Sequence, residues 1–157
     1  MLSKEDFDYY ARKLTSNDPD DRGYGARNAR AEDIGDERLL PLLEPLLQDK
    51  RFTITGGMPP RYCEVRLLAA KAINRQKKLL GLPGKVSSIG FVYPGSYGMM
   101  SVFAERKTGI GMMDRPSFDS TSAELEYLNK QGVLPVFTSD KYPYLDYSTL
   151  PGNEDED

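Results

Sequence analysis

The sequence predicts an α+β protein that is mainly α-helical, with helix pairs in its first half and a small C-terminal half that contains a β-hairpin. Leucine-rich stretches at 37–48 and 64–80 repeat apolar residues on a helical period, which is typical of amphipathic helices. Glycine and proline at 81–84 then mark a boundary. Beyond the boundary, β-branched and aromatic residues replace the helical pattern, which favours strands.

Two helices are expected before the leucine-rich stretches. Ser3 begins a variant capping box in front of an amphipathic segment at 4–15, which predicts a first helix. An Asp-Pro pair then begins a second helix at 19–33. Gly23 and Gly25 make this second helix weak on propensity alone, because each costs about 1 kcal/mol relative to Ala.

The third helix is expected at 37–48. Gly35 is the predicted C-cap of the preceding helix, and Asp36 is the predicted N-cap of this one. Pro41 and Pro45 lie inside the segment, where each removes a backbone hydrogen bond, so a kink or curve is expected.

An insertion at 52–62 separates this helix from the next one, which is expected at 64–80. The insertion is rich in Gly and Pro and predicts a long loop. Loops of this kind in stacked helices often lie on a binding face, whereas a tolerated surface insertion is the equal alternative.

Several motifs repeat along residues 18–80. An Asp-Pro-Asp start is followed by Ile-Gly-Asp at 34–36, a Leu/Pro-rich helix, Asp49, and a last helix with Val-Arg at 65–66 and Ala-Ala at 69–70. This segment resembles the short HEAT-like repeats of the phycobilisome-lyase type. The resemblance implies a HEAT-like helical region over 1–82, with protein–protein contact as its usual role.

The C-terminal half is predicted to form a small α/β region at 85–140, packed on the first half as one domain. A hairpin is expected from strands at 86–93 and 97–105, followed by a helix at 123–131. Residues 141–157 have the composition of an acidic, tyrosine-rich tail.

Charge and composition limit the class of protein. The chain of 157 residues has a net charge of −3 and 39% hydrophobic residues, as is ordinary for a soluble domain. Residues 1–84 hold 15 Lys/Arg and 13 Asp/Glu, whereas 85–157 hold 6 and 11. The absence of a basic excess makes nucleic acid an unfavoured partner. We expect a cytoplasmic protein, because no secretory signal or membrane span is visible and the single cysteine cannot pair internally.

The residues do not favour catalysis. Histidine is absent, which excludes Ser–His, Cys–His and His-based zinc chemistry. Cys63 lies near a helix N-terminus, where its pKa can fall, but an inert and partly buried thiol is the preferred interpretation. We therefore predict no enzyme activity, no cofactor and no metal.

The predicted function is a non-catalytic protein–protein interaction module, with an inhibitor or immunity protein that neutralises a partner as one specific form. The alternatives are an accessory lyase or chromophore chaperone, which the resemblance allows, and a nucleic-acid-contacting helical module. Positive charge on the last helix, a place in the insertion, or Tyr and Met side chains indicate the candidate partner-binding residues: Arg61, Tyr62, Arg66, Lys71, Arg75, Tyr97, Met99, Tyr142, Tyr144 and Tyr147.

Overall fold

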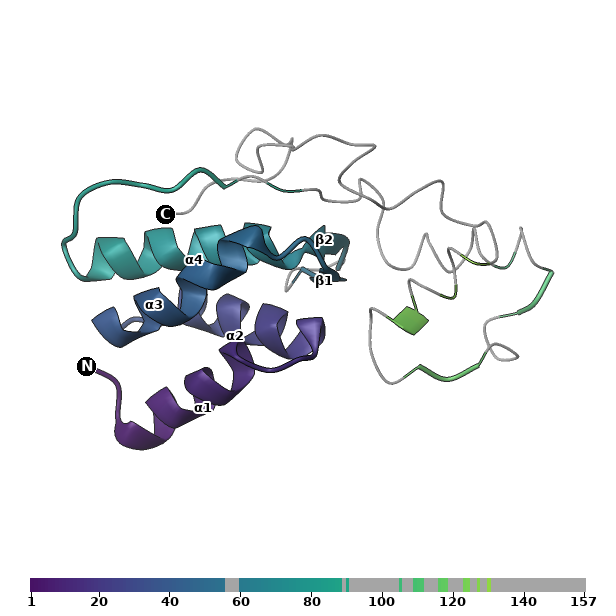
Figure 1. The fold of residues 1–157 in the computed structure, drawn as a ribbon, viewed down its shortest axis with the longest axis horizontal. Helices are drawn as coiled ribbons and strands as arrows, with labels where there is room; N and C mark the ends of the chain where they lie inside the picture. The colour runs from purple at the N-terminus through teal and green to yellow at the C-terminus, as the bar shows by residue number, and fades with distance from the viewer. Residues whose placement is uncertain are drawn as a thin grey trace.

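A computed structural model describes residues 1–55, 60–88 and 90, together with a few isolated positions up to residue 130. The described chain is mostly helical with a small antiparallel sheet, which confirms the predicted α+β class (Figure 1). The elements are α1 (Lys4–Leu14), α2 (Pro19–Ala31), η1 (Glu37–Leu39), α3 (Leu40–Leu43), η2 (Glu44–Gln48), β1 (Phe52–Ile54), β2 (Tyr62–Glu64) and α4 (Val65–Leu79).

Both first helices begin with the predicted caps. The Ser3 hydroxyl accepts a hydrogen bond from the backbone N–H of Asp6 at 3.1 Å, and Asp18 caps α2 in the same manner. The prediction that Gly35 ends α2 is wrong, because α2 ends at Ala31. Gly35 instead lies against the end of α4, where an added Cβ would come within 2.9 Å of the Leu79 Cβ.

The glycines in α2 allow close packing. A Cβ at Gly23 would lie 2.6 Å from the Thr53 Cγ2 of β1, and one at Gly25 would lie 3.0 Å from Leu14 of α1. The helix therefore forms despite two unfavourable residues, because both allow neighbouring elements to approach its backbone.

The leucine-rich stretch at 37–48 is not one kinked helix, as predicted, but three short helical segments. Asp36 caps it as predicted, by accepting from the Arg38 N–H at 3.0 Å. Two 3-10 segments, η1 and η2, then flank the single α-helical turn of α3. Pro41 falls at the start of α3 and Pro45 at the start of η2, where a missing N–H costs least.

The insertion contains strands that the loop prediction missed. β1 and β2 pair antiparallel, with Phe52 opposite Glu64, Thr53 opposite Cys63 and Ile54 opposite Tyr62. β1 contains the strand-favouring residues Phe52, Thr53 and Ile54, but three residues are too short a pattern to outweigh the Gly/Pro content of residues 56–59, which lie outside the described residues. The insertion is therefore a short hairpin that leads directly into α4.

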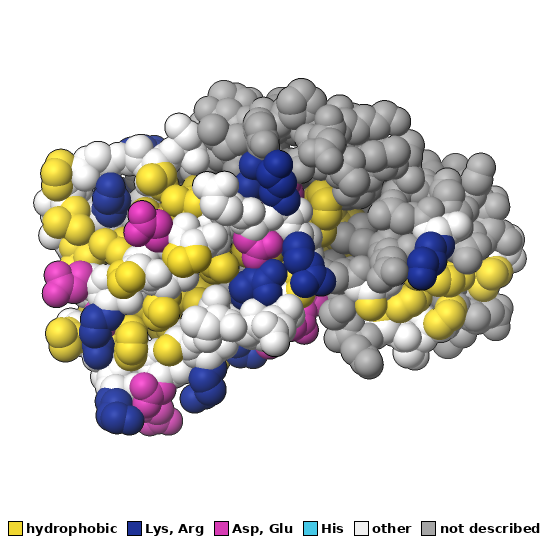
Figure 2. Space-filling model, in the orientation of Figure 1, with side chains coloured by type: hydrophobic (Ala, Val, Ile, Leu, Met, Phe, Trp, Pro, Cys, Tyr) yellow, Lys and Arg dark blue, Asp and Glu magenta, His cyan; other side chains and the backbone are white. Residues whose placement is uncertain are grey.

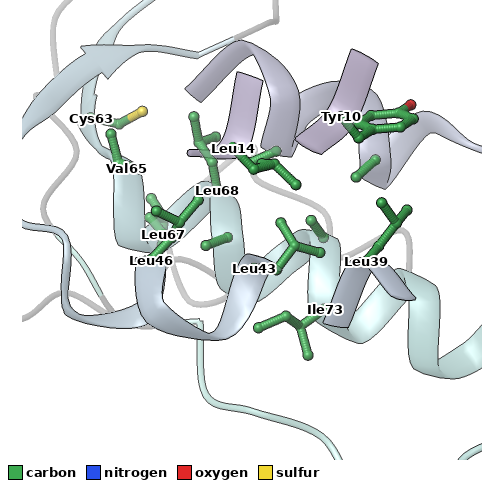
Figure 3. Packing of buried hydrophobic residues seen from close by; sticks show 14 of the residues in the cluster. Tyr10, Leu14, Leu39, Leu43, Leu46, Cys63, Val65, Leu67, Leu68 and Ile73 are labelled. Carbon is green, nitrogen blue, oxygen red and sulfur yellow. The ribbon is translucent and has the colours of Figure 1, made fainter. Parts of the chain in front are cut away.

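α4 is the central helix. It packs chiefly against α2, η2 and α3, and most of its residues are buried. Figure 3 shows the leucines of the divided stretch facing α4, with Leu46 near Val65 and Leu67 and with Leu39 nearer to Tyr10. The core thus joins α2, α3 and η2 through α4, and residues of α1 complete it.

Residues 82–88 run back along α4 (Figure 1). The Asn74 amide binds the Val86 backbone twice, accepting from its N–H and donating to its C=O, both at 2.8 Å. Gly90 then reaches Leu67, because a Cβ there would lie 3.0 Å from the Leu67 Cβ. The described part of the predicted strand 86–93 is therefore held by a helix side chain and not by a second strand.

The remaining C-terminal predictions fall largely outside the described residues. Ala123, Glu124, Tyr127 and Lys130 are helical, in agreement with the helix predicted at 123–131. Glu105 is also helical, and its carbonyl accepts from the Gly109 N–H at 2.8 Å, so the strand predicted at 97–105 is wrong at that position. The hairpin turn and the tail at 141–157 lie outside the described residues.

A buried polar network ties α4 to the end of α2, to the residue that caps η1 and to the N-terminal residues. The Gln76 side chain of α4 accepts from the Asp36 N–H at 2.8 Å and donates to the Ala29 carbonyl of α2 at 3.1 Å. The Asp36 carboxylate in turn accepts from the Leu2 N–H at 3.0 Å and from Arg38 at 2.6 Å. The hydrogen bonds from Arg38 outweigh burial and lower the Asp36 pKa to about 2.

This network makes the folding stability depend on pH. The Asp36 pKa falls from 3.8 to about 2 on folding, so its ionised form contributes about 2 kcal/mol above pH 4, which is lost as the pH falls to about 2. We expect Asp36→Asn to lower the free energy of unfolding by about 2 kcal/mol at pH 7. Urea titrations from pH 7 to pH 2 should show the difference from wild type shrinking in the acid range. Asp33→Asn, at a carboxylate that is 97% exposed, is the control and should follow wild type at every pH. A constant gap for Asp36→Asn would contradict the assignment.

Substitution of Gly23 tests the close approach of β1 to α2. Helix propensity alone predicts that Gly23→Ala stabilises the protein by about 1 kcal/mol. We expect the opposite, a loss of about 1–2 kcal/mol, because the buried and stiff Thr53 side chain cannot move away from the new methyl group. Thermal unfolding of Gly23→Ala, Thr53→Ala and the double variant should show that the double variant loses less than the sum. Additive losses would mean that the two residues do not compete for space.

Candidate functional site

Three of the predicted partner-binding residues lie in the interior. Tyr62 is 0% exposed, Arg66 is 7% and Lys71 is 1%. Arg66 forms an ion pair with the buried Glu64, at the junction of β2 and α4. The expectation that these side chains form an exposed face is corrected, because α4 is the central helix and its polar residues are enclosed together with its apolar ones.

The other predicted residues are divided between the surface and the undescribed chain. Arg75 is partly exposed and donates to the Glu32 carbonyl at 3.3 Å, with Asp33 at 3.6 Å. Arg61 is partly exposed and directly precedes β2. The remaining five lie outside the described residues: Tyr97, Met99, Tyr142, Tyr144 and Tyr147.

A surface that the sequence did not predict surrounds Tyr24. This side chain is 48% exposed, which is unusual for a large ring in the described chain. The Arg27 guanidinium lies 5.3 Å from the ring centre and the Lys13 ammonium lies 5.7 Å from it. A cation close to an aromatic ring is a favourable arrangement, and tyrosine and arginine are both enriched in protein interfaces.

The ring borders a groove of about 340 Å³, which we call the Tyr24 groove. α1, α2 and β1 all contribute to it, through Lys13, Asp20, Asp21, Tyr24, Arg27, Thr53 and Ile54. Figure 2 shows side chains of both charges interspersed over the visible face of the helical body. Ile54 gives the groove an apolar side chain among these polar ones.

The position of Tyr24 follows from its neighbours in sequence. Gly23 and Gly25 are both buried against other elements, so the residue between them faces outward. The sequence signal was present, a tyrosine between two glycines in a polar helix. The sequence alone does not reveal this signal, because glycines lower helix propensity and their close contacts with β1 and α1 exist only in the folded protein.

The carboxylates of the groove already have partners. Asp21 accepts from Ser16 at 2.8 Å and from Lys13 at 3.1 Å, and these two hydrogen bonds lower its pKa. Asp20 accepts from the Thr53 hydroxyl of β1 at 2.9 Å. These carboxylates therefore fix the walls of the groove and are poorly placed to act as a general base.

The other candidate features carry less chemistry. A larger hollow, of about 590 Å³, lies along α1 alone and is lined by Lys4, Glu5, Asp6, Asp8, Tyr9 and Arg12. No cluster of potential metal ligands occurs within the part of the chain that the structure describes. Over the same residues, no helix is long and apolar enough to cross a membrane.

Cys63 is more deeply buried than the sequence predicts. It is 0% exposed, and burial raises its pKa to about 12, although Arg27 and Arg61 act in the opposite direction. A thiol of this pKa is almost wholly protonated at neutral pH and is a poor nucleophile.

Comparison with models of protein families, with curated proteins and with solved structures gave no match for this chain.

The burial of Cys63 predicts its reactivity. Under native conditions at pH 8 we expect the thiol to react with a disulfide reagent at least about a hundredfold more slowly than in 6 M guanidinium chloride, because both access and thiolate formation are suppressed. The release of the coloured thiolate from the reagent measures the rate. A native rate close to that of the unfolded chain would show that the site is open to solvent.

Proposed function

We propose that the chain is a non-catalytic protein-binding module that works in the cytoplasm and contacts its partner through the Tyr24 groove. Its helices would act as a HEAT-like scaffold, and inhibition of the bound protein, in the manner of an immunity protein, is the specific role that we put forward. The supporting observation is the half-exposed Tyr24 ring with the cations of Lys13 and Arg27 close to it.

The chemistry of the groove supports a binding function more than a catalytic one. Its acidic residues are engaged by Lys13, Ser16 and Thr53, and the only cysteine of the chain is enclosed in the core. What remains at the surface is an aromatic ring, an isoleucine and cations, which are the side chains that supply contact energy in protein interfaces.

Neither alternative function gains a specific observation. A nucleic-acid interface would need a basic face on α4 that includes Arg66 and Lys71, and both of these side chains are buried. The accessory-lyase or chromophore-chaperone interpretation rests on the family resemblance alone. We therefore put forward protein binding as the single function.

The proposal predicts that Tyr24 dominates the affinity for the partner. We expect Tyr24→Ala to weaken binding about thirtyfold, equivalent to about 2 kcal/mol, because a well-packed interface tyrosine is a typical hot spot. Affinity capture of tagged full-length protein from its source cells, followed by titration of the captured partner, measures the effect.

Ile34→Ala is the matched control, since Ile34 is a similarly exposed apolar residue, at 47%, beyond the C-terminal end of α2. It should bind within about twofold of wild type. Equal binding by wild type and Tyr24→Ala would refute the role of the groove. A captured partner that is toxic when produced alone, and harmless with this chain, would support the inhibitor role, and a harmless partner would count against it.

A further inference from the structure

The outer edge of β1 borders the Tyr24 groove. The sheet that the structure describes has two strands, so β1 pairs with β2 along one side only. Thr53 and Ile54 of β1 line the groove, whereas no residue of β2 does. The groove therefore lies on the side of β1 that faces away from β2, and residues of α1 and α2 form its other walls.

The register of the sheet determines where the backbone groups of Ile54 point. The Thr55 N–H donates to the Arg61 carbonyl at 2.8 Å, which makes Thr55 a position that is bonded to the opposite strand. In an antiparallel pair, bonded positions alternate with positions whose N–H and C=O point away from the partner strand. Ile54, one residue earlier and opposite Tyr62, therefore directs both groups away from β2. Neither group has a hydrogen bond to any residue that the structure describes.

An edge position of this kind is suited to receive another strand. Unpaired N–H and C=O groups at a sheet edge are a template for an extended chain, and peptide recognition by strand addition uses them as its main contacts. Ile54 supplies one donor and one acceptor. The half-exposed Tyr24 ring lines the same groove and offers an apolar surface to a side chain of the added segment.

The charges that line the groove are balanced. Lys13 and Arg27 contribute two positive charges, and Asp20 and Asp21 contribute two negative ones. On charge alone, this lining attracts neither an acidic nor a basic ligand, and it gives no advantage to a phosphate backbone. Main-chain hydrogen bonds and apolar contact are left to supply the affinity, which favours an uncharged segment.

We propose that the Tyr24 groove binds an extended, uncharged segment of a partner protein, which adds as a strand to the outer edge of β1 at Ile54 and places an apolar side chain on Tyr24. This inference rests on the proposed protein-binding function and adds the conformation and the charge of the bound segment.

A proline at position 54 tests the edge directly. Proline has no N–H and is tolerated on an edge strand where that group points outward, so Ile54→Pro should keep the pairing of β1 with β2. The probes are synthetic peptides from a phage library of random dodecapeptides selected on the immobilised full chain. We expect Ile54→Pro to weaken their binding at least about tenfold, since a hydrogen bond is lost and the ring obstructs the approach of a strand. The matched control Ile54→Val keeps the N–H and should bind within about twofold of wild type.

Methylation of the peptide backbone gives a second measurement that does not depend on the folding of a variant. In an added strand, alternate N–H groups point toward β1. An N-methyl group at the peptide residue that pairs with Ile54 should weaken binding at least about tenfold, and one at either flanking residue should change it less than about threefold. Circular dichroism melts of Ile54→Pro show whether its loss of binding follows from unfolding.

The outcomes separate the two proposals. Peptides that need Tyr24 but bind Ile54→Pro as tightly as wild type, or that accept an N-methyl group at every position, would overturn strand addition and leave the protein-binding function standing. Selected peptides that share a strong charge would overturn the uncharged segment. An absence of peptides that depend on Tyr24 would overturn both proposals. A wild-type dimer in sedimentation that Ile54→Pro converts to a monomer would assign the edge of β1 to a second copy of the chain instead.

Discussion

The amide of Gln76 holds together the parts of the chain that meet around α4. Because α4 is buried on nearly all sides, each of its polar side chains must find a partner inside the protein. Gln76 uses both ends of its amide, donating to the Ala29 carbonyl near the end of α2 and accepting from the Asp36 N–H. Asp36 then binds the Leu2 N–H, so the N-terminus, the end of α2 and the leucine-rich stretch are all fixed relative to one helix.

The same enclosure of α4 determines which charges remain available for function. Arg66 and Lys71 lie within the core, and Arg22 is bound to Asp49 at 2.6 Å between α2 and β1. Cations held in the interior in this manner cannot contact a partner. The surface charges near Tyr24 belong to α1 and α2, where the packing around α4 leaves side chains in contact with solvent.

Local signals predicted the helices and their caps well. Ser3, Asp18 and Asp36 cap the elements that their sequence positions indicated, because capping depends on a few neighbouring residues. The pairing of β1 with β2 was not predicted, since three-residue strands carry too short a pattern to outweigh a Gly/Pro-rich turn.

The candidate site was largely beyond the reach of sequence reasoning. The positive charge on α4 predicts an exposed face, whereas in the structure α2, α3 and η2 pack against this helix and Arg66 and Lys71 are buried. The exposure of Tyr24 cannot be predicted from the sequence, because it depends on the packing of Gly23 against β1 and of Gly25 against α1. None of the predicted residues that the structure describes lines the Tyr24 groove.

The groove is held by elements that are fixed independently of any partner. α2 is packed against α4 on one side and bound to β1 through Thr53 and Asp20, while Lys13 and Ser16 tie the end of α1 to Asp21. Side chains that are already ordered lose little conformational entropy when they bind, so more of the contact energy is kept as affinity. The tight contact between Gly23 and Thr53 therefore connects stability to recognition, because a shift of β1 away from α2 would move Ile54 relative to Tyr24 and open the groove between them.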